Sequence, residues 1–184
     1  DQDGHNDLML TQSDSFYLQL LKGPDWLDDN NTLIVGLTPI SLQAGDWNND
    51  GRKDIAVANR GMDSISILLN NGNDNFTTAA TLDTADFPQQ LMQGDWNGDN
   101  VTDLASLSFG ENLLQLWKGK GDGTFEKTSD LDTPSSPQQL EVADFDCDGR
   151  QDLAISSRSA GVAVVVVMVW DSLLVFYRYF LLVY

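Results

Sequence analysis

Oxygen-bearing side chains recur at alternate positions in three nine-residue segments of the chain. Each segment follows the pattern Asp-x-(Asp or Asn)-x-Asp-(Gly or Asn)-x-x-Asp, and the three copies cover residues 46–54, 95–103 and 144–152. Carboxylate and amide oxygens in a tight loop suit Ca²⁺, which takes about six to eight oxygen ligands. Mg²⁺ keeps more of its water and takes fewer protein ligands, so it is the second choice. The spacing therefore predicts calcium sites.

The calcium loop of an EF-hand offers a guide to which atoms bind. In that loop, side chains 1, 3 and 5 bind the ion and position 7 offers its carbonyl oxygen, so we expect the side chain of Arg52 to point outward. These segments end on Asp at position 9, lack the Glu of position 12, and precede strand-like residues, so they are not EF-hands. Position 6 needs a sharp turn, which Gly51 and Gly149 provide and Asn100 tolerates.

Net charge supports a cation in these loops. The chain has 28 acidic and 10 basic residues, for a formal net charge of −18. Asp/Asn/Gly-rich loops often do no more than connect strands, and that alternative stays open for any single copy. Several carboxylates within one short loop repel one another unless a cation neutralises them, and three copies in register favour the metal site. The same acidity argues against nucleic-acid binding, which needs a basic surface.

Other residue types restrict the chemistry further. The chain has one cysteine, Cys147, which excludes an intrachain disulfide and a cysteine-based zinc site, and we expect it to be an exposed thiol. Its one histidine, His5, leaves little room for histidine-dependent catalysis. The three glutamates are widely spaced, and we expect them to be surface charges: Glu111, Glu126 and Glu141.

The whole chain repeats in the register of these loops. Pro39, Pro88 and Pro137 precede the three segments at a constant distance, and we expect them to fix the entry of a strand. Short apolar runs bounded by turn residues follow one another about four times in each unit, which is typical of a propeller blade. We therefore predict an all-β fold, a partial β-propeller of about three to four blades with four antiparallel strands each. The expected units are residues 1–38, 39–87, 88–136 and 137–170.

Aromatic residues occupy one position in each loop. Trp47, Trp96 and Phe145 stand at position 2, where packing between neighbouring blades is a better prediction than stacking on a ligand. Trp26 and Trp117 lie near expected strand ends and could contact sugars, but packing is again the better prediction.

These residues together resemble a known family. The runs 46–59, 64–72 and 121–125 resemble the FG-GAP/VCBS repeats of integrin-α-like β-propellers and of many secreted or surface bacterial proteins. The resemblance covers residues 1 to about 170, and it implies Ca²⁺ in a loop between two strands of each blade. With the position-7 carbonyls added, the implied ligands are Asp46, Asn48, Asp50, Arg52 and Asp54; Asp95, Asn97, Asp99, Val101 and Asp103; and Asp144, Asp146, Asp148, Arg150 and Asp152. The opening copy lacks position 1, so that Asp1, Asp3 and Asp7 form an incomplete site.

Two features depart from a complete member of that family. A closed seven-bladed propeller with this repeat needs about 340 residues, whereas the chain has 184, so we expect a fragment or an open arc. Residues 171–184 form an atypical apolar tail, for which a strand-like or poorly folded end is the preferred interpretation. A membrane span from Gly161 onward would enclose Asp171 and Arg178, which is costly, so we expect no membrane insertion.

The expected function is binding rather than catalysis. The resemblance implies a calcium-binding module of a secreted or cell-surface protein that serves adhesion, ligand binding or scaffolding. Its partner would be an extracellular protein or a glycan, and no signal peptide is visible in this sequence. The alternative is a part, catalytic or not, of a secreted polysaccharide-active enzyme, which a glycan screen for binding and turnover would distinguish. A purely structural spacer is a third interpretation.

Overall fold

The computed structural model describes residues 4–25, 32–73, 75–145, 147, 149–158, 163–169 and 174–180, the last two ranges for the backbone only. Every regular element in these ranges is a β-strand. The strands are β1 (Leu8–Thr11), β2 (Tyr17–Leu21), β3 (Thr32–Ile34), β4 (Pro39–Gly45), β5 (Asp54–Asn59), β6 (Ser64–Asn70), β7 (Phe76–Asp83), β8 (Pro88–Gly94), β9 (Asp103–Ser108), β10 (Leu113–Gly119), β11 (Phe125–Asp132), β12 (Pro137–Ala143), β13 (Asp152–Ser157), β14 (Ala163–Val169) and β15 (Leu174–Phe180).

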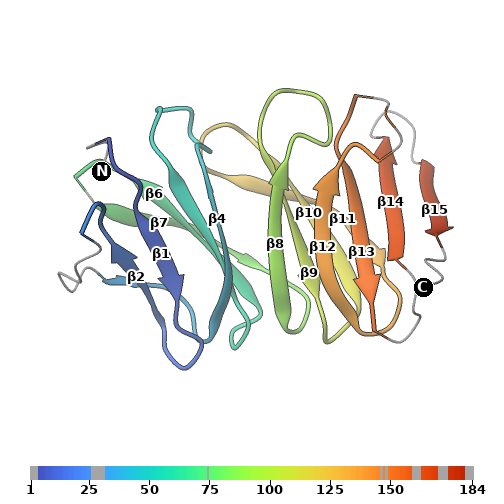
Figure 1. Cartoon of the computed structure of the whole chain (residues 1–184), viewed down its shortest axis with the longest axis horizontal. Coiled ribbons are helices and arrows are strands. Elements are labelled where there is room, and N and C mark those ends of the chain that lie inside the picture. Colours follow the sequence, from blue (N-terminus) through green and yellow to red (C-terminus); the bar gives the residue numbers. More distant parts are fainter. Residues whose placement is uncertain are drawn as a thin grey trace.

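The strands form four separate antiparallel sheets in chain order. The first sheet is β1-β2-β3, and the others are β4-β5-β6-β7, β8-β9-β10-β11 and β12-β13-β14-β15. The four sheets stand side by side in an arc from the N-terminal to the C-terminal end (Figure 1). This arrangement confirms the predicted all-β fold of partial-propeller blades.

The first sheet differs from the predicted four strands. In the repeat register β1 corresponds to β5 and β9, because the opening loop that ends on Asp7 leads into β1 as the loop that ends on Asp54 leads into β5. The strand that corresponds to β4 would fall before Asp1 in that register. Among the described residues, β1 therefore pairs only with β2, and its other edge carries no strand.

Proline marks the start of each complete sheet, as the sequence predicts. Pro39, Pro88 and Pro137 begin β4, β8 and β12, and each is followed by an irregularity in pairing with the next strand. Proline lacks a backbone N–H and is tolerated at the first position of a strand or at a bulge. The repeated proline therefore sets where each blade begins.

Glutamine and serine side chains join the first strands of neighbouring sheets. The amide of Gln90 donates to the carbonyl of Leu140 at 2.8 Å, and its oxygen accepts from the Leu140 N–H at 2.7 Å. Between β4 and β8, Gln43 Nε2 donates to the carbonyl of Leu91 at 2.9 Å, and Ser41 Oγ accepts from the N–H of Leu91 at 3.0 Å. These bonds satisfy backbone groups that no strand of the same sheet reaches, and they hold adjacent blades at a fixed spacing.

The core lies between the sheets rather than within one of them. All six residues of β5 and of β9 are buried, as expected for strands covered on both faces. One cluster joins Ile65 and Ile67 of the second sheet to Leu91 and Leu104 of the third, and an equivalent cluster joins the third to the fourth. Each blade therefore completes its core only against its neighbour.

The C-terminal end extends the fourth sheet. Strand β15 pairs with β14 along seven residue pairs. The segment that we expected to be an atypical apolar tail, residues 171–184, therefore contributes the backbone of a fourth strand. Among the described residues no helix is long enough and apolar enough to cross a membrane.

Truncation of a core leucine tests the packing between blades. Leu107 of β9 is fully buried, whereas Leu37 is 48% exposed. We expect Leu107→Ala to lower the free energy of unfolding by about 2–5 kcal/mol, and Leu37→Ala to change it by less than about 0.5 kcal/mol, both measured by urea denaturation. Equal losses in the two variants would contradict this account of the core.

Candidate metal centre

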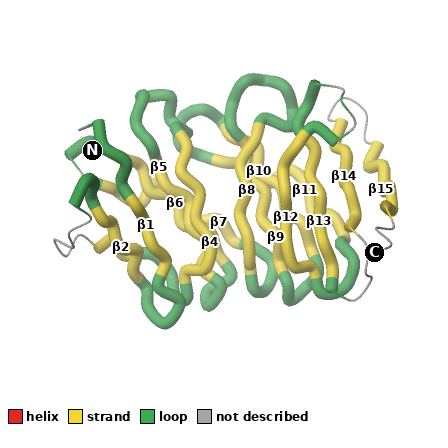
Figure 2. The backbone as a smooth tube through the Cα atoms, viewed as in Figure 1, coloured by secondary structure: helices red, strands yellow, loops and turns green. Residues whose placement is uncertain are grey.

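The three acidic loops lie at equivalent places in consecutive sheets. Each connects the first strand of a sheet to the second, and the three loops lie along one edge of the arc (Figure 2). The structure places position 9, which is Asp54, Asp103 or Asp152, as the first residue of the second strand. The candidate ligands of each loop are thus gathered where two adjacent strands diverge.

Position 1 closes the loop on itself. The carboxylate of Asp46 accepts the N–H groups of Asp50 and Gly51 at 3.1 and 2.9 Å. Asp95 accepts the equivalent N–H of Asn100 at 2.8 Å, and Asp144 accepts that of Gly149 at 2.9 Å. Side-chain acceptors of this kind compensate backbone donors that have no strand partner.

Two positions of each loop adopt the left-handed backbone conformation. At position 6 the φ angles of Gly51, Asn100 and Gly149 are 83°, 63° and 87°, as the sequence predicts. At position 4 the angles are also positive, 59° for Asn49 and 62° for Cys147. Few residue types tolerate this region, so the sharp turn needs permissive residues at positions 4 and 6, of which the residue pattern predicted position 6. The prediction that Cys147 is exposed is confirmed.

Position 9 has a structural role that the sequence did not reveal. Asp54 is fully buried, and its two oxygens accept the N–H of Trp47 and the N–H of Asn70, both at 2.9 Å. Asp103 repeats this arrangement with the N–H groups of Trp96 at 3.3 Å and Gly119 at 2.9 Å. This carboxylate therefore ties the loop to the end of the third strand.

Burial raises the pKa of these two aspartates. For Asp54 and Asp103, desolvation is the largest cause, the backbone N–H groups oppose it, and the neighbouring loop carboxylates add to it. The pKa of Asp103 rises to about 6, with repulsion from Asp99 and Asp95 among its causes. The carboxylates at positions 1, 5 and 9 thus lie close enough to repel one another, which is the field that a divalent cation would relieve.

A basic side chain contacts the carboxylate at position 5 in both loops that the structure describes in full, residues 46–54 and 95–103. The guanidinium of Arg52 bonds to Asp50 and also donates through Nε to the carbonyl of Asn70 at 2.6 Å. Lys118 Nζ lies 2.9 Å from Asp99 Oδ2. Our expectation that the Arg52 side chain points outward is therefore wrong, because the carboxylate and the strand-end carbonyl both attract it.

These contacts hold the pKa of the position-5 aspartates low. Burial acts in the opposite direction, but the backbone N–H of Arg52, the Asn48 amide and the Arg52 charge hold the pKa of Asp50 below its ordinary value. Burial is likewise outweighed at Asp99, where the hydrogen bond and charge of Lys118 lower the pKa together with the Val101 N–H. Both carboxylates are therefore anionic and available as ligands at neutral pH.

The donor set of the two fully described loops fits Ca²⁺ chemically. Each supplies two carboxylates and an amide at positions 1, 3 and 5, a carbonyl at position 7 and a buried carboxylate at position 9. Within the described residues, no three Asp, Glu, His or Cys side chains are gathered to hold a metal ion as they stand. In each of these loops one carboxylate meets a basic group, Asp50 with Arg52 and Asp99 with Lys118.

The remaining predicted ligands are described only in part. In the fourth loop, Phe145 donates its N–H to Asp152 at 2.8 Å, whereas Asp146 and Asp148 lie outside the described residues. In the opening loop, Asp7 accepts the N–H of Gly23 at 3.2 Å, as Asp54 accepts that of Asn70. Asp1 and Asp3 of that loop also lie outside the described residues.

The position-2 aromatics confirm the packing prediction in two copies and contradict it in one. Trp47 is 2% exposed and Trp96 is 3% exposed, and each packs against the next sheet. Phe145 is 46% exposed, so its predicted burial is wrong: no further sheet follows the fourth in the described chain to cover it.

Trp117 is buried, as predicted, and Trp26 lies outside the described residues. Glu111, Glu126 and Glu141 are exposed, as predicted.

Comparison with known proteins identifies the repeat. The family model of the FG-GAP-like repeat matches residues 1–57, 46–106 and 95–155. The chain belongs to the FG-GAP-like repeat family. Each matched span runs from one acidic loop to just beyond the next, so the FG-GAP register is the one that the loops themselves set.

Solved structures share the fold of this FG-GAP chain at low sequence identity. A protein of unknown function from Desulfotomaculum acetoxidans matches with a TM-score of 0.67 and 16% identity, over 90% of this chain and 52% of its own. A protein described as a "putative 6-phosphogluconolactonase" from Bacteroides uniformis matches with a TM-score of 0.67 and 12% identity, over 97% of this chain and 54% of its own. The chain spans about half the length of these structures. No match was found among curated proteins.

The raised pKa of Asp103 predicts a pH dependence of stability in calcium-free protein. The folded pKa of Asp103, about 6, exceeds its unfolded value of 3.8, so this group adds to the free energy of unfolding. The added stability is fully present below the unfolded pKa and is lost as the pH rises through the folded pKa. We expect the urea midpoint of the wild type, relative to that of Asp103→Asn, to fall between about pH 4 and about pH 6.5 in EGTA. A difference in urea midpoint between the two proteins that stays constant over this pH range would contradict the raised pKa of Asp103.

Proposed function

We propose that the chain is a calcium-stabilised FG-GAP module that binds an extracellular partner without catalysis. The observation that carries the proposal is the repeated loop, in which three mutually repelling carboxylates, an amide and a carbonyl occupy the point where two strands diverge. FG-GAP repeats are typical of extracellular or cell-surface proteins, and extracellular calcium is concentrated enough for weak oxygen-only sites.

Calcium would act on the fold rather than on a reaction. In the second loop the ion would be held by the side chains of Asp46, Asn48, Asp50 and Asp54 and by the carbonyl of Arg52. The third loop offers Asp95, Asn97, Asp99 and Asp103 with the carbonyl of Val101, and the fourth offers its equivalents. When bound, the ion supplies positive charge to the loop, so that its binding free energy adds to the stability of the folded state.

A partner would meet a surface formed by several blades. The acidic loops lie along one edge of the arc (Figure 2), so neutralising them changes the charge along that edge. We infer that this edge engages an extracellular protein or glycan, in an adhesive or scaffolding role. Calcium would then control both the rigidity and the charge of the binding surface.

Thermal unfolding in calcium and in EGTA tests the proposal. At a calcium concentration about 100 times the Kd, binding stabilises the folded state by about 2.7 kcal/mol. Each kcal/mol raises the Tm of a domain of this size by about 2–4 °C. We therefore expect a Tm several degrees higher in calcium than in EGTA, measured by circular dichroism or calorimetry.

Matched variants assign the effect to the loops. The double variant Asp50→Ala/Asp99→Ala removes one ligand from each of the two fully described loops, and we expect it to lose most of the calcium-dependent rise in Tm. The variant Glu111→Gln removes an exposed acid in the turn between β9 and β10, away from the loops, and should keep the full rise. A Tm that does not respond to calcium, or an equal response in all three proteins, would refute the proposed role.

A further inference from the structure

A polar pocket of about 270 Å³ lies at the edge of the arc opposite the acidic loops. The described residues that line it are Arg60, Gln89, Phe109, Ser136, Gln138 and Arg158. Arg60, Phe109 and Arg158 each follow the second strand of a sheet, whereas an acidic loop precedes that strand. A strand of six residues, such as β5, spans about 20 Å, so the pocket is well separated from the loops.

Equivalent positions of three consecutive sheets form this pocket. Arg60, Phe109 and Arg158 follow one another at a constant step of 49 residues along the chain. The N–H of Arg158 donates to the carbonyl of Ser136 at 3.0 Å, and the N–H groups of Arg60 and Phe109 make the equivalent bonds at 2.9 and 3.0 Å. The fold therefore fixes the backbone from which all three side chains extend.

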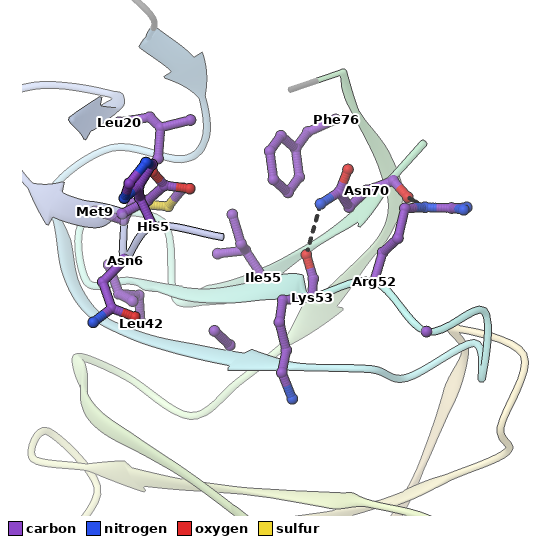
Figure 3. A pocket seen from close by; sticks show the side chains of 13 residues that line it. His5, Asn6, Met9, Leu20, Leu42, Arg52, Lys53, Ile55, Asn70 and Phe76 are labelled. Carbon is purple, nitrogen blue, oxygen red and sulfur yellow. Dashed lines mark hydrogen bonds between the residues drawn. The ribbon is translucent and has the colours of Figure 1, made fainter. Parts of the chain in front are cut away.

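Two arginines give the pocket a positive charge in an otherwise acidic chain. The sequence has 10 basic residues against 28 acidic ones, yet none of the six described lining residues is acidic. Among the described residues, no carboxylate forms an ion pair with the guanidinium of Arg60 or Arg158. By contrast, Arg52 bonds to Asp50 and lies beside Asn70 (Figure 3). The pocket therefore presents cationic groups that no described carboxylate neutralises.

An exposed aromatic ring positions Arg60. The guanidinium carbon of Arg60 lies 5.8 Å from the centroid of the Phe87 ring, which is within the range of a cation–π contact. Phe87 is 47% exposed and has a φ of 57°, a strained conformation for a bulky residue. The equivalent residues, Thr38 and Ser136, have the same conformation but are small and polar. The turn therefore does not require an aromatic residue, and the one present holds a cation in place.

Uncharged polar groups and an aromatic ring complete the lining. Gln89 Nε2 donates to the carbonyl of Gln138 at 3.2 Å, and Gln138 Nε2 donates to the carbonyls of Ser136 and Pro137, both at 3.3 Å. With the amide nitrogens engaged, the amide oxygens are acceptors for a ligand, and the Ser136 hydroxyl can donate or accept. Phe109 adds a half-buried apolar surface. This combination suits a ligand that carries hydroxyl groups as well as an anionic group.

We propose that this pocket binds an anionic sugar unit of a glycan, one that carries a carboxylate or a sulfate group. The planar guanidinium groups of Arg60 and Arg158 bind the anionic group through paired N–H donors. The amide oxygens and the Ser136 hydroxyl bind the sugar hydroxyls, and the Phe109 ring covers an apolar face of the sugar. The volume is close to the lower limit of small-ligand sites, about 300 Å³, which suits a single unit of a longer glycan.

Calorimetric titration of the whole chain with defined oligosaccharides tests this site. The probes are trigalacturonate and a sulfated galactose trisaccharide, and the control is the methyl ester of trigalacturonate, which keeps the rings and loses the charge. We expect at least one probe to bind saturably and at least about tenfold more tightly than the methyl ester, because hydrogen bonds to charged groups are the strongest contacts available. The probe that binds identifies the anionic group.

Charge-removing variants locate the binding. Arg60→Gln and Arg158→Gln each remove one guanidinium from the pocket, and each should weaken probe binding at least about tenfold. Lys127 is exposed on β11 and does not line the pocket, so Lys127→Gln removes the same charge elsewhere and should leave the affinity unchanged. Circular dichroism establishes that all three variants are folded.

The outcomes separate this pocket from the calcium loops. The pocket does not depend on the proposed role of calcium, and all titrations are made in the same excess of calcium, so their failure would not alter the comparison of Tm in calcium and EGTA. The proposal would be overturned if neither probe bound saturably or if the methyl ester bound as tightly as the probes. Undiminished binding to both folded arginine variants, or an equal loss in Lys127→Gln, would overturn it as well.

Discussion

The structure depends on a buried carboxylate at the start of the second strand of each blade. Asp54 and Asp103 each accept one N–H from the acidic loop and one from the end of the third strand, so a single side chain connects three segments of the blade. Asp152 accepts the loop N–H in the same way, and Asp7 accepts the strand-end N–H. Without this acceptor, buried backbone donors would lose their partners, at a cost of about 1–3 kcal/mol each.

The same carboxylate links the fold to the proposed chemistry. It must remain buried to serve the backbone, and burial together with the loop acids raises its pKa. A cation at the loop would relieve that repulsion while leaving the backbone hydrogen bonds in place, because each carboxylate oxygen has more than one lone pair. Arg52 and Lys118 supply part of this positive charge through the position-5 aspartates. The loops therefore balance their negative charge with basic side chains or with calcium.

Much of the fold follows from the sequence because its signals are local and repeated. Proline at the start of each first strand, glycine or asparagine at position 6, and continuous apolar runs in β5 and β9 each specify a backbone conformation or a burial pattern by residue type alone. The contact of Arg52 with Asp50 did not follow, because a long side chain chooses among partners that only the folded loop brings near. The exposure of Phe145 did not follow either, because burial at position 2 is determined by the next blade and not by the loop.

Amide hydrogen exchange tests the role of the buried carboxylate most directly. The N–H groups of Asn70 and Gly119 close their bonds on Asp54 and Asp103 at the ends of β6 and β10, where strand ends ordinarily fray. We predict that both amides exchange as slowly as those in the centres of β5 and β9, and that Asp54→Ala selectively accelerates exchange at Asn70. Exchange at Asn70 and Gly119 as fast as at exposed loop amides in the unaltered protein would contradict the account.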